Sequence, residues 1–288
     1  MTSPRTLLGA FDLHAKKQLG QNFLTDSAIP EMIVAKSGLA AGDIVLEIGA
    51  GLGALTIASA KVADKVYAVE RDYNLIPILK NELAAAGVSE KVEIIHSDIL
   101  RVDLPAIAQK HTGKIRVMGN LPYNISSQIL IWLIHSRSYV DKAFFMLQKE
   151  LADRIVAPPK AKDYGRLSAV IQYCSTVKRL VAIGSGQFFP KPKVDSEVIE
   201  VSFAGKPEQS AHDEEFLFSV IKAAFGQRRK NLKNSLTGSQ LGIDTEHVLE
   251  ALAQSAIDHQ RRAETLTIQE FVTLSDRLGA YRPEQDAS

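Results

Sequence analysis

The sequence predicts an α/β fold with an open, mostly parallel sheet, followed by a small all-helical C-terminal domain. Short runs of β-branched and apolar residues alternate with helix-length segments between residues 26 and 203, which is the pattern of a sheet wound with helices. Beyond a linker-like segment at 204–210, apolar residues recur only at helical spacing. We therefore expect a sheet domain over residues 1–204, with a flexible flap at 1–25, and a helical domain over 205–288.

Composition defines the broad class of protein. The 288 residues are 45% hydrophobic and 23% charged, with a formal net charge of +1, so any nucleic-acid partner must bind a locally basic surface. Cys174 is the only cysteine, which excludes an intrachain disulfide, and its apolar neighbours predict a core position. Because no apolar run reaches membrane-spanning length and the N-terminal one is too short for a signal segment, we expect a cytoplasmic protein that binds no membrane.

The elements of the sheet domain can be justified in order. Asp26 caps a helix that runs to about residue 37 and ends at Gly38. Apolar and β-branched runs predict strands at 43–48, 65–69, 92–96, 114–118, 143–148, 178–183 and 197–203. Further helices are expected at about 54–63, 73–86, 128–134, from 149 onward and at 168–174. Ligands of open α/β sheets bind at the carboxyl ends of the strands, so the residues after each strand are the candidate site.

A glycine-rich turn follows the first strand. Gly49, Gly51 and Gly53 lie where the chain passes from strand to helix, and glycines there let the backbone approach a ligand closely. Glu70 ends the second strand about twenty residues further on, where an acid can accept the hydroxyls of a ribose. A turn that binds a dinucleotide cofactor has the same glycine pattern. The turn therefore predicts a ligand that contains a nucleoside but does not identify the cofactor.

The third strand ends just before Asp98 and Ile99. The carboxylate can accept a hydrogen bond from an adenine amino group while the apolar side chain packs on the ring. An aspartate that only caps a helix or turn is the alternative. No cluster of His, Cys and acidic residues has the spacing of metal ligands, and we expect no metal site.

The fourth strand leads into Gly119-Asn120-Leu121-Pro122-Tyr123-Asn124. The residue before a proline is held in extended geometry, so the Leu121 carbonyl cannot turn back into a helix. That carbonyl and the Asn120 amide are two acceptors beside the Tyr123 ring, a set that suits the exocyclic amino group of a planar base. A plain turn that caps the next helix is the alternative that these six residues leave open.

Two further segments combine cations with aromatic or apolar residues. The loop 188–196 holds Phe188, Lys191 and Lys193 beside two prolines that stiffen it, as in sites that stack bases. An aromatic plug beneath a hairpin is the alternative for this loop. A predicted helical segment of the C-terminal domain has no acid between residues 222 and 235, whereas solvated helix faces usually mix both signs of charge. We interpret the following basic residues as phosphate contacts: Lys16, Lys17, Lys191, Lys193, Lys222, Arg228, Arg229, Lys230 and Lys233.

Together these segments resemble the ribosomal RNA adenine N6-dimethyltransferase family over nearly the whole chain. The glycine turn alone is unspecific, but Asn-Leu-Pro-Tyr is typical of methyltransferases that act on amino groups, and Leu121 and Asp195 favour the branch that acts on small-subunit RNA. The resemblance is carried by Gln21 to Leu24, Glu47 to Gly53, Glu70, Asp98, Asn120 to Tyr123, Phe188 to Ser196 and the basic segment.

The resemblance implies a Rossmann-like, S-adenosylmethionine-dependent methyltransferase sheet and an RNA-binding helical domain. It implies a monomer that converts two adjacent adenines near the 3′ end of 16S rRNA to N6,N6-dimethyladenosine during maturation of the small ribosomal subunit precursor. By resemblance, the cofactor-binding residues are Gln21, Asn22, Leu24, Gly49, Gly51, Glu70, Asp98, Ile99 and Asn120. The catalytic set would be Asn120, Leu121, Pro122, Tyr123 and Phe188, with Tyr123 and Phe188 on either side of the flipped base.

Three other functions share part of this pattern. A large-subunit adenine methyltransferase of the antibiotic-resistance type would share every catalytic residue. An NAD-dependent oxidoreductase would explain the glycine turn and Glu70 but would leave residues 120–123 without a role. A non-catalytic RNA-binding assembly factor would keep the scaffold and bind without turnover.

Overall fold

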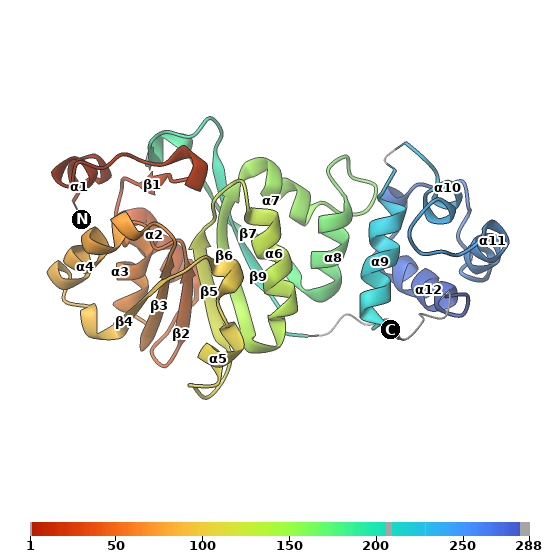
Figure 1. Ribbon diagram of the computed structural model, residues 1–288, viewed down its shortest axis with the longest axis horizontal. Helices are drawn as coiled ribbons and strands as arrows, with labels where there is room; N and C mark the ends of the chain where they lie inside the picture. Colours follow the sequence, from red (N-terminus) through yellow and green to blue (C-terminus); the bar gives the residue numbers. More distant parts are fainter. Residues whose placement is uncertain (1, 206–208, 228, 283–288) are drawn as a thin grey trace. The chain divides into compact units, whose positions relative to one another are not determined.

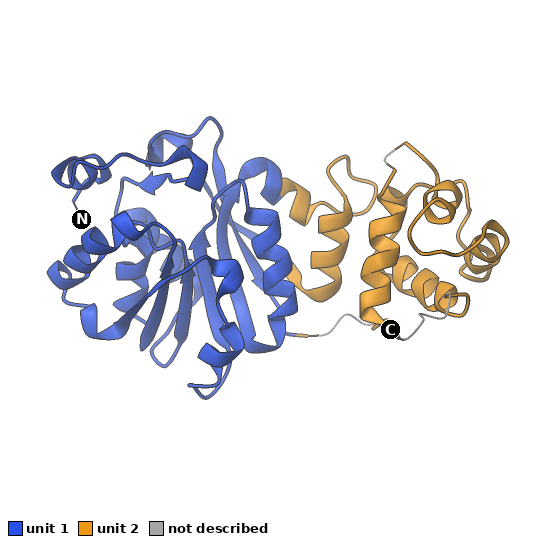
Figure 2. Ribbon diagram, in the orientation of Figure 1, with its two compact units in different colours: residues 1–152, 177–204 blue, residues 153–176, 205–288 orange. Residues whose placement is uncertain are grey.

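In the computed structural model, which describes residues 2–205, 209–227 and 229–282, the chain forms two units (Figure 2). The first combines residues 1–152 and 177–204, and the second combines 153–176 with 205–288. The sequence predicted a division near residue 204 but assigned 153–176 to the sheet domain. That segment belongs with the C-terminal helices because its aromatic residues pack there: Tyr173 meets Phe218 edge-on, and Tyr164 meets Phe225 in the same way.

A seven-stranded sheet forms the centre of the first unit, in the order β4-β3-β2-β5-β6-β9-β7 (Figure 1). Strands β2 to β6 pair in parallel along this order, and β9 runs antiparallel to β6. Every strand predicted from the sequence is present, with ends shifted by a few residues at most. The strands are β2 (Ile44–Ile48), β3 (Lys65–Glu70), β4 (Val92–His96), β5 (Ile115–Asn120), β6 (Val140–Gln148), β7 (Thr176–Ile183) and β9 (Ser196–Ser202).

A second, two-stranded sheet was not predicted. Strand β1 (Phe23–Leu24) pairs antiparallel with β8 (Phe188–Phe189), so that Phe23 lies opposite Phe189 and Leu24 opposite Phe188. Both strands have only two residues, too few to show a periodic pattern. This pairing ties the predicted N-terminal flap to the proline-containing loop.

The helices of the first unit follow the predicted pattern, with two additions. The predicted flap 1–25 contains a short helix, α1, whose Pro4, Leu7 and Leu8 are buried, and whose first turn is capped by the Ser3 side chain. A second short helix, α5, precedes β5. The helices are α1 (Pro4–Ala10), α2 (Ala28–Ser37), α3 (Ala54–Ala60), α4 (Ile76–Ala85), α5 (Leu104–Ala108), α6 (Ser126–His135) and α7 (Lys149–Val156), the last crossing into the second unit.

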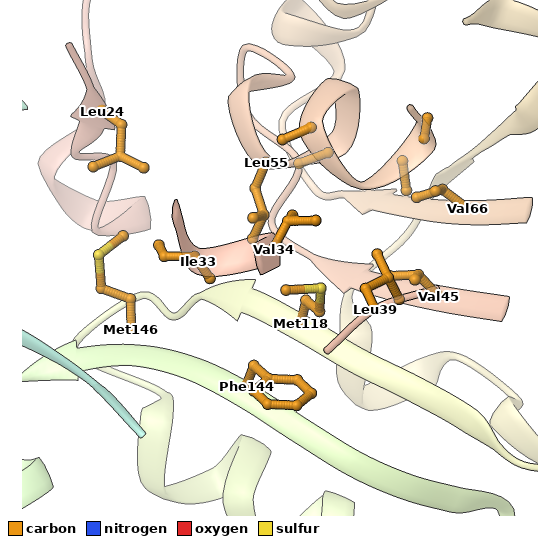
Figure 3. Close-up of a cluster of buried hydrophobic side chains, with 14 of the residues drawn as sticks. Leu24, Ile33, Val34, Leu39, Val45, Leu55, Val66, Met118, Phe144 and Met146 are labelled. Atoms are coloured by element: carbon orange, nitrogen blue, oxygen red, sulfur yellow. The ribbon is translucent and has the colours of Figure 1, made fainter. Parts of the chain in front are cut away.

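The main core of the first unit lies between α2, α3 and the sheet (Figure 3). Val45, Val66, Met118 and Phe144 are almost wholly buried and come from four neighbouring strands, so alternate residues of each strand face the same helices. Burial of one such side chain stabilises the fold by about 1.5–3 kcal/mol. Leu24 from β1 and Phe188 from β8 belong to the same cluster, which anchors the two-stranded sheet to the main one.

In its described part, the second unit consists of helices joined by loops, and it contains α8 (Arg166–Cys174), α9 (Glu214–Ala224), α10 (Leu232–Thr237), α11 (Thr245–Gln254) and α12 (Ile268–Gly279). Cys174 is buried, as predicted. Among the described residues, no helix has both the length and the apolar character needed to span a membrane.

The basic segment of this unit is not a continuous helix, which corrects the sequence prediction. Helix α9 ends at Ala224 and α10 begins at Leu232, so Arg229 and Lys230 lie in the connecting turn. The break occurs because the Asn231 side chain caps α10 by accepting a hydrogen bond from the Asn234 backbone N–H at 3.0 Å. Arg228 lies outside the described residues.

The close approach of β5 to β2 at Gly119 leads to a prediction. A Cβ atom on Gly119 would lie 2.7 Å from the Ile48 carbonyl oxygen and 3.1 Å from Leu121 Cδ2, so the two strands would have to separate. We expect Gly119→Ala to lower the free energy of unfolding by about 1–3 kcal/mol, measured by denaturant titration. Gly9→Ala is the matched control, because nothing lies within 4 Å of its Cβ position in α1 and alanine favours helix. Equal stability of both variants would contradict the crowding argument.

Candidate active site

One pocket at the carboxyl ends of the central strands gathers the residues predicted to hold the cofactor. They come from the N-terminal segment, from the turn after β2 and from the ends of β3, β4 and β5. The pocket lining includes Gln21, Asn22, Leu24, Gly49, Gly51, Glu70, Asp98, Ile99 and Asn120. Residues that are far apart in the sequence therefore face one cavity.

The glycine turn forms one wall of this pocket. Gly49 has a φ of 76° and Gly51 a φ of 56°, in the left-handed region that side chains other than glycine adopt at a cost. A Cβ atom on Gly51 would also lie 3.2 Å from the Phe23 ring. The turn is thus held as bare backbone, the surface that a ligand can approach most closely.

Glu70 lies at the base of the same wall. Its side chain is only 6% exposed, and its two oxygens accept backbone hydrogen bonds from Gly51 at 2.8 Å and Asp72 at 2.7 Å. Burial raises the pKa of this carboxyl above its usual value, against the lowering effect of the two N–H groups. Each carboxylate oxygen has two lone pairs, so both can still accept hydroxyl groups of a ligand.

Asp98 has two roles in the structure. Its carboxylate accepts the backbone N–H of Leu100 at 3.1 Å, which caps a short 3-10 turn, and it lies 3.4 Å from the Arg71 guanidinium. The capping role left open by the sequence is therefore real, but Asp98 and Arg71 also line the pocket. The neighbouring Ile99 is buried and presents an apolar surface beside the carboxylate.

The orientation of the Asn120 amide is fixed by a hydrogen bond. Its Nδ2 donates to the backbone carbonyl of Asn22 at 2.8 Å. Because a carbonyl can only accept, the amide nitrogen must face Asn22 and Oδ1 must face away from it. Among the residues that the structure describes, none donates to Asn120 Oδ1 or to the Leu121 carbonyl. Within this described part, two acceptors on adjacent residues are therefore without a donor. Asn120 lines the pocket, whereas Leu121 and Tyr123 are not among the residues that line it.

The remaining residues of the motif are held firmly. The Pro122 carbonyl accepts hydrogen bonds from the Ser126 hydroxyl at 2.7 Å and the Ile125 N–H at 3.2 Å, which starts α6. The half-buried Tyr123 hydroxyl lies 3.4 Å from Ser196 Oγ, and burial raises its pKa. Gly20 packs so closely that a Cβ atom there would lie 3.1 Å from Pro122 Cβ.

Phe188 does not line the pocket. It is 3% exposed and belongs to the main core, whereas Phe189 points to the opposite side of β8, as neighbouring strand residues do. Phe189 is half-buried, and the Arg5 guanidinium lies 5.4 Å from its ring centre. The sequence recognised the aromatic pair but could not tell which ring the two-residue strand turns inward.

The predicted phosphate contacts fall into three groups. Lys16 is bound to the Asp72 carboxylate at 2.7 Å, so its charge is already paired. Lys17, Lys191 and Lys193 are exposed in the first unit, and Lys222, Arg229 and Lys230 are exposed in the second. Lys233 is half-buried in the second unit.

The second unit adds basic residues that the sequence did not bring to notice. The turn 229–234 lies beside residues 258–262, joined by backbone hydrogen bonds from Leu232 to Arg261 at 2.8 Å and from Lys233 to His259 at 3.3 Å. Arg229, Lys230 and Lys233 thus share an open groove with His259 and Arg262. The Arg261-Arg262 pair can be seen in the sequence, but it lies about thirty residues after the first basic segment. The sequence therefore gives no sign that the two segments share a groove.

Glu47 leads to a prediction about pH and stability. It is 2% exposed and lines the pocket, and its Oε2 has no hydrogen-bond partner among the described residues. Burial, and secondarily the Glu70 charge, raises the pKa of Glu47 to about 8. The folded state then binds a proton that the unfolded chain releases above pH 4.5, so this residue's contribution to stability falls between pH 4.5 and about 8.

We expect Glu47→Gln to remove this contribution, which at its steepest is on the order of 1 kcal/mol per pH unit. The measurement is the free energy of unfolding across pH 5 to 9, with the exposed Glu90→Gln as control. The stability difference between Glu47→Gln and wild type should grow in favour of the variant as pH rises. A constant difference would contradict a protonated Glu47.

Comparisons with known proteins agree with this geometry. The family model described as "Ribosomal RNA adenine dimethylase" matches residues 12–279. A relative from Desulforapulum autotrophicum named "Ribosomal RNA small subunit methyltransferase A" is 52% identical over 286 residues, which cover 99% of this chain and 100% of the relative. A relative of the same name from Alkaliphilus oremlandii is 41% identical over 276 residues, covering 95% of each chain.

Two solved structures share the fold. A dimethyladenosine transferase from Plasmodium falciparum has a TM-score of 0.75 and 22% identity, over 90% of this chain and 98% of that chain. The 23S rRNA methyltransferase ErmE has a TM-score of 0.66 and 23% identity, over 89% of this chain and 99% of that chain. With the family match and the two sequence relatives, these findings show that the chain belongs to the ribosomal RNA adenine dimethylase family of S-adenosylmethionine-dependent methyltransferases.

Proposed function

We propose that this chain transfers methyl groups from S-adenosylmethionine to N6 of two adjacent adenines near the 3′ end of small-subunit (16S) ribosomal RNA, as part of maturation of the small subunit. The names of the relatives with 52% and 41% identity support the small-subunit substrate. The observation that carries the chemistry is the Asn120 amide, whose hydrogen bond to Asn22 turns Oδ1 away from Asn22 and leaves it as an acceptor in the pocket.

The pocket residues fit the methyl donor. The bare backbone at Gly49 and Gly51 suits the methionine portion, Glu70 has lone pairs for the ribose hydroxyls, and Asp98 and Ile99 suit the adenine. When bound, the donor supplies a methyl group on a sulfonium, which needs no further electrophilic activation. The role of the protein is then to hold the acceptor nitrogen in line with that methyl group.

The difficulty lies with the acceptor, because the N6 lone pair of adenine is delocalised into the ring. Asn120 Oδ1 and the Leu121 carbonyl can accept the two N–H bonds of the amino group. Such acceptors favour a pyramidal nitrogen with its lone pair directed at the methyl group, and they stabilise the positive charge that develops as the new bond forms. The proton then leaves from a cationic product, which requires no strong base.

Tyr123, which lies between the pocket-lining residues Pro122 and Asn124, is the aromatic residue that we assign to stacking on the flipped base, with about 1–3 kcal/mol expected for one stack. Phe188 packs in the core, so a base-stacking role would require its ring to leave that cluster. In the arrangement seen here, Phe188 supports β8 from the core side. Action as a monomer in the cytoplasm, where a ribosomal substrate would be found, belongs to the same proposal.

Asn120 provides the first test of the mechanism. We expect Asn120→Ala to reduce methyl transfer by at least about 100-fold while the dissociation constant of S-adenosylmethionine, measured by calorimetry, changes by less than about tenfold. Asn120→Asp is the informative companion: it keeps the acceptor oxygens but cannot donate to Asn22, so it should also lose turnover. Near-wild-type transfer by Asn120→Ala would exclude the proposed role.

The substrate is tested by offering labelled S-adenosylmethionine with small and large ribosomal subunits that lack the dimethyladenines. We expect label in N6,N6-dimethyladenosine of the small-subunit RNA. Label only in large-subunit RNA would keep the chemistry and overturn the substrate. Cofactor binding without any label would favour the non-catalytic assembly factor.

The basic groove of the second unit gives a separate prediction about RNA affinity. Substituting Arg229 and Lys230 by alanine should weaken binding to small subunits and reduce the slope of log K against log salt by roughly 0.7–0.9 for each phosphate that the protein no longer neutralises. Lys36→Ala with Lys80→Ala, exposed on α2 and α4, is the matched control of equal charge. An identical slope in both double variants would remove the groove from the interface.

A further inference from the structure

Asp72 is a buried carboxylate that is not among the residues lining the pocket. It is 5% exposed. Lys16 Nζ donates to Oδ1 at 2.7 Å, and Gln21 Nε2 donates to Oδ2 at 2.8 Å. The backbone N–H of Asn74 also donates to Oδ1, at 3.2 Å. Three donors therefore surround one charge, and two of them come from the N-terminal segment, which is distant in the sequence.

The segment 16–22 is fixed internally as well. The Gln21 side-chain oxygen accepts the Lys16 backbone N–H at 2.7 Å, which closes the segment into a loop. Asn22 Nδ2 donates to the Gly20 carbonyl at 3.0 Å. The three-residue turn Lys17–Leu19 lies inside this loop. Asp72 therefore binds both ends of a compact unit, and a shift at Asp72 would move the whole unit.

This loop is connected to both ends of the pocket, directly at the acceptor end and through Asp72 at the nucleoside end. At the nucleoside end, the Asp72 backbone N–H donates to Glu70 Oε1 at 2.7 Å. At the acceptor end, the Asn22 carbonyl fixes the Asn120 amide and Gly20 packs on Pro122. Asn124 Nδ2 also donates to the Gln18 carbonyl at 3.2 Å. The chain of contacts runs from Glu70 through Asp72 and Gln21 to Asn120.

We propose that Asp72, through Lys16 and Gln21, is a positioning residue for methyl transfer that holds segment 16–22 in place and so orients the Asn120 amide. The proposal rests on the proposed function, because it extends the role of Asn120 to the residues that hold it. We call Asp72 and its two side-chain partners, Lys16 and Gln21, the latch. The proposal assigns Lys16 to this latch and not to RNA binding, which changes the role predicted from the sequence.

Adjacent lysines make the assignment testable. Lys16 is bound to Asp72, whereas Lys17 is exposed. Lys16→Met should raise the dissociation constant of S-adenosylmethionine and lower kcat by about tenfold or more, since small displacements of a catalytic group have large effects on rate. The salt dependence of RNA binding should be the same for Lys16→Met as for the wild type. Lys17→Met should leave cofactor affinity unchanged, and any effect should appear in RNA binding.

The pair itself is tested by a double-mutant cycle. Asp72→Asn and Lys16→Met should each lower kcat, and the double variant should resemble the more damaged single variant, because both break one latch. Lys16→Arg, which keeps the charge, should restore most of the activity. Additive losses, or a lower melting temperature with kcat and cofactor affinity unchanged, would reduce Asp72 to a purely structural residue and overturn the proposal.

Hydrogen exchange separates this proposal from the proposed function. The amides of Leu19 and Gly20 donate within the loop at 3.1 and 3.0 Å, and their protection can be measured without RNA or turnover. We expect both amides to lose protection in Asp72→Asn and Lys16→Met but to keep it in Lys17→Met. Unchanged protection in all three variants would overturn the latch even in an active methyltransferase. If both amides lose protection in the two latch variants while the wild-type chain transfers no methyl group, the latch is supported and only the proposed methyltransferase function is contradicted.

Discussion

The pairing of β5 with β2 is the constraint on which the site depends. Gly119 lies opposite Ile48 in the parallel register, and the space between the strands leaves no room for a side chain at that position. The next residues along each strand are Asn120 and Gly49, and a Cβ atom on Gly49 would lie 3.8 Å from the Asn120 carbonyl oxygen. A shift of one residue in register would separate the glycine turn from the Asn120 motif and reverse the faces of the strand. The joint position of cofactor and acceptor sites is therefore a property of the sheet.

The sheet and the pocket could be predicted from the sequence because their signals are local. Buried parallel strands are continuous apolar runs, and ligands of such sheets bind where the strands end. Residues as distant as Gly49, Glu70, Asp98 and Asn120 could be assigned to one edge on that basis alone. Their contacts in one pocket follow from the strand order.

The errors have a common cause, which is that each depends on a contact between distant segments or on a single side chain. Lys16 was taken as a free cation because its partner, Asp72, lies in a different part of the chain. For Phe188, base stacking was favoured over a core position because two-residue strands have no readable periodicity. The basic segment was extended as one helix because the Asn231 cap is a single side chain among polar neighbours. Local patterns identify which residues matter, whereas tertiary contacts decide how each is used.

The pairing of β1 with β8 has a consequence for the order of folding. The N-terminal strand finds its partner only at residues 188 and 189, and the intervening stretch 153–176 belongs to the other unit. Closure of such a long loop has an entropic cost that local helices and neighbouring strands do not bear. During synthesis, the glycine turn and β2 to β6 are complete well before this partner emerges. The N-terminal segment that lines the pocket therefore closes late, because the chain holds no partner for β1 until residues 188 and 189 have been made.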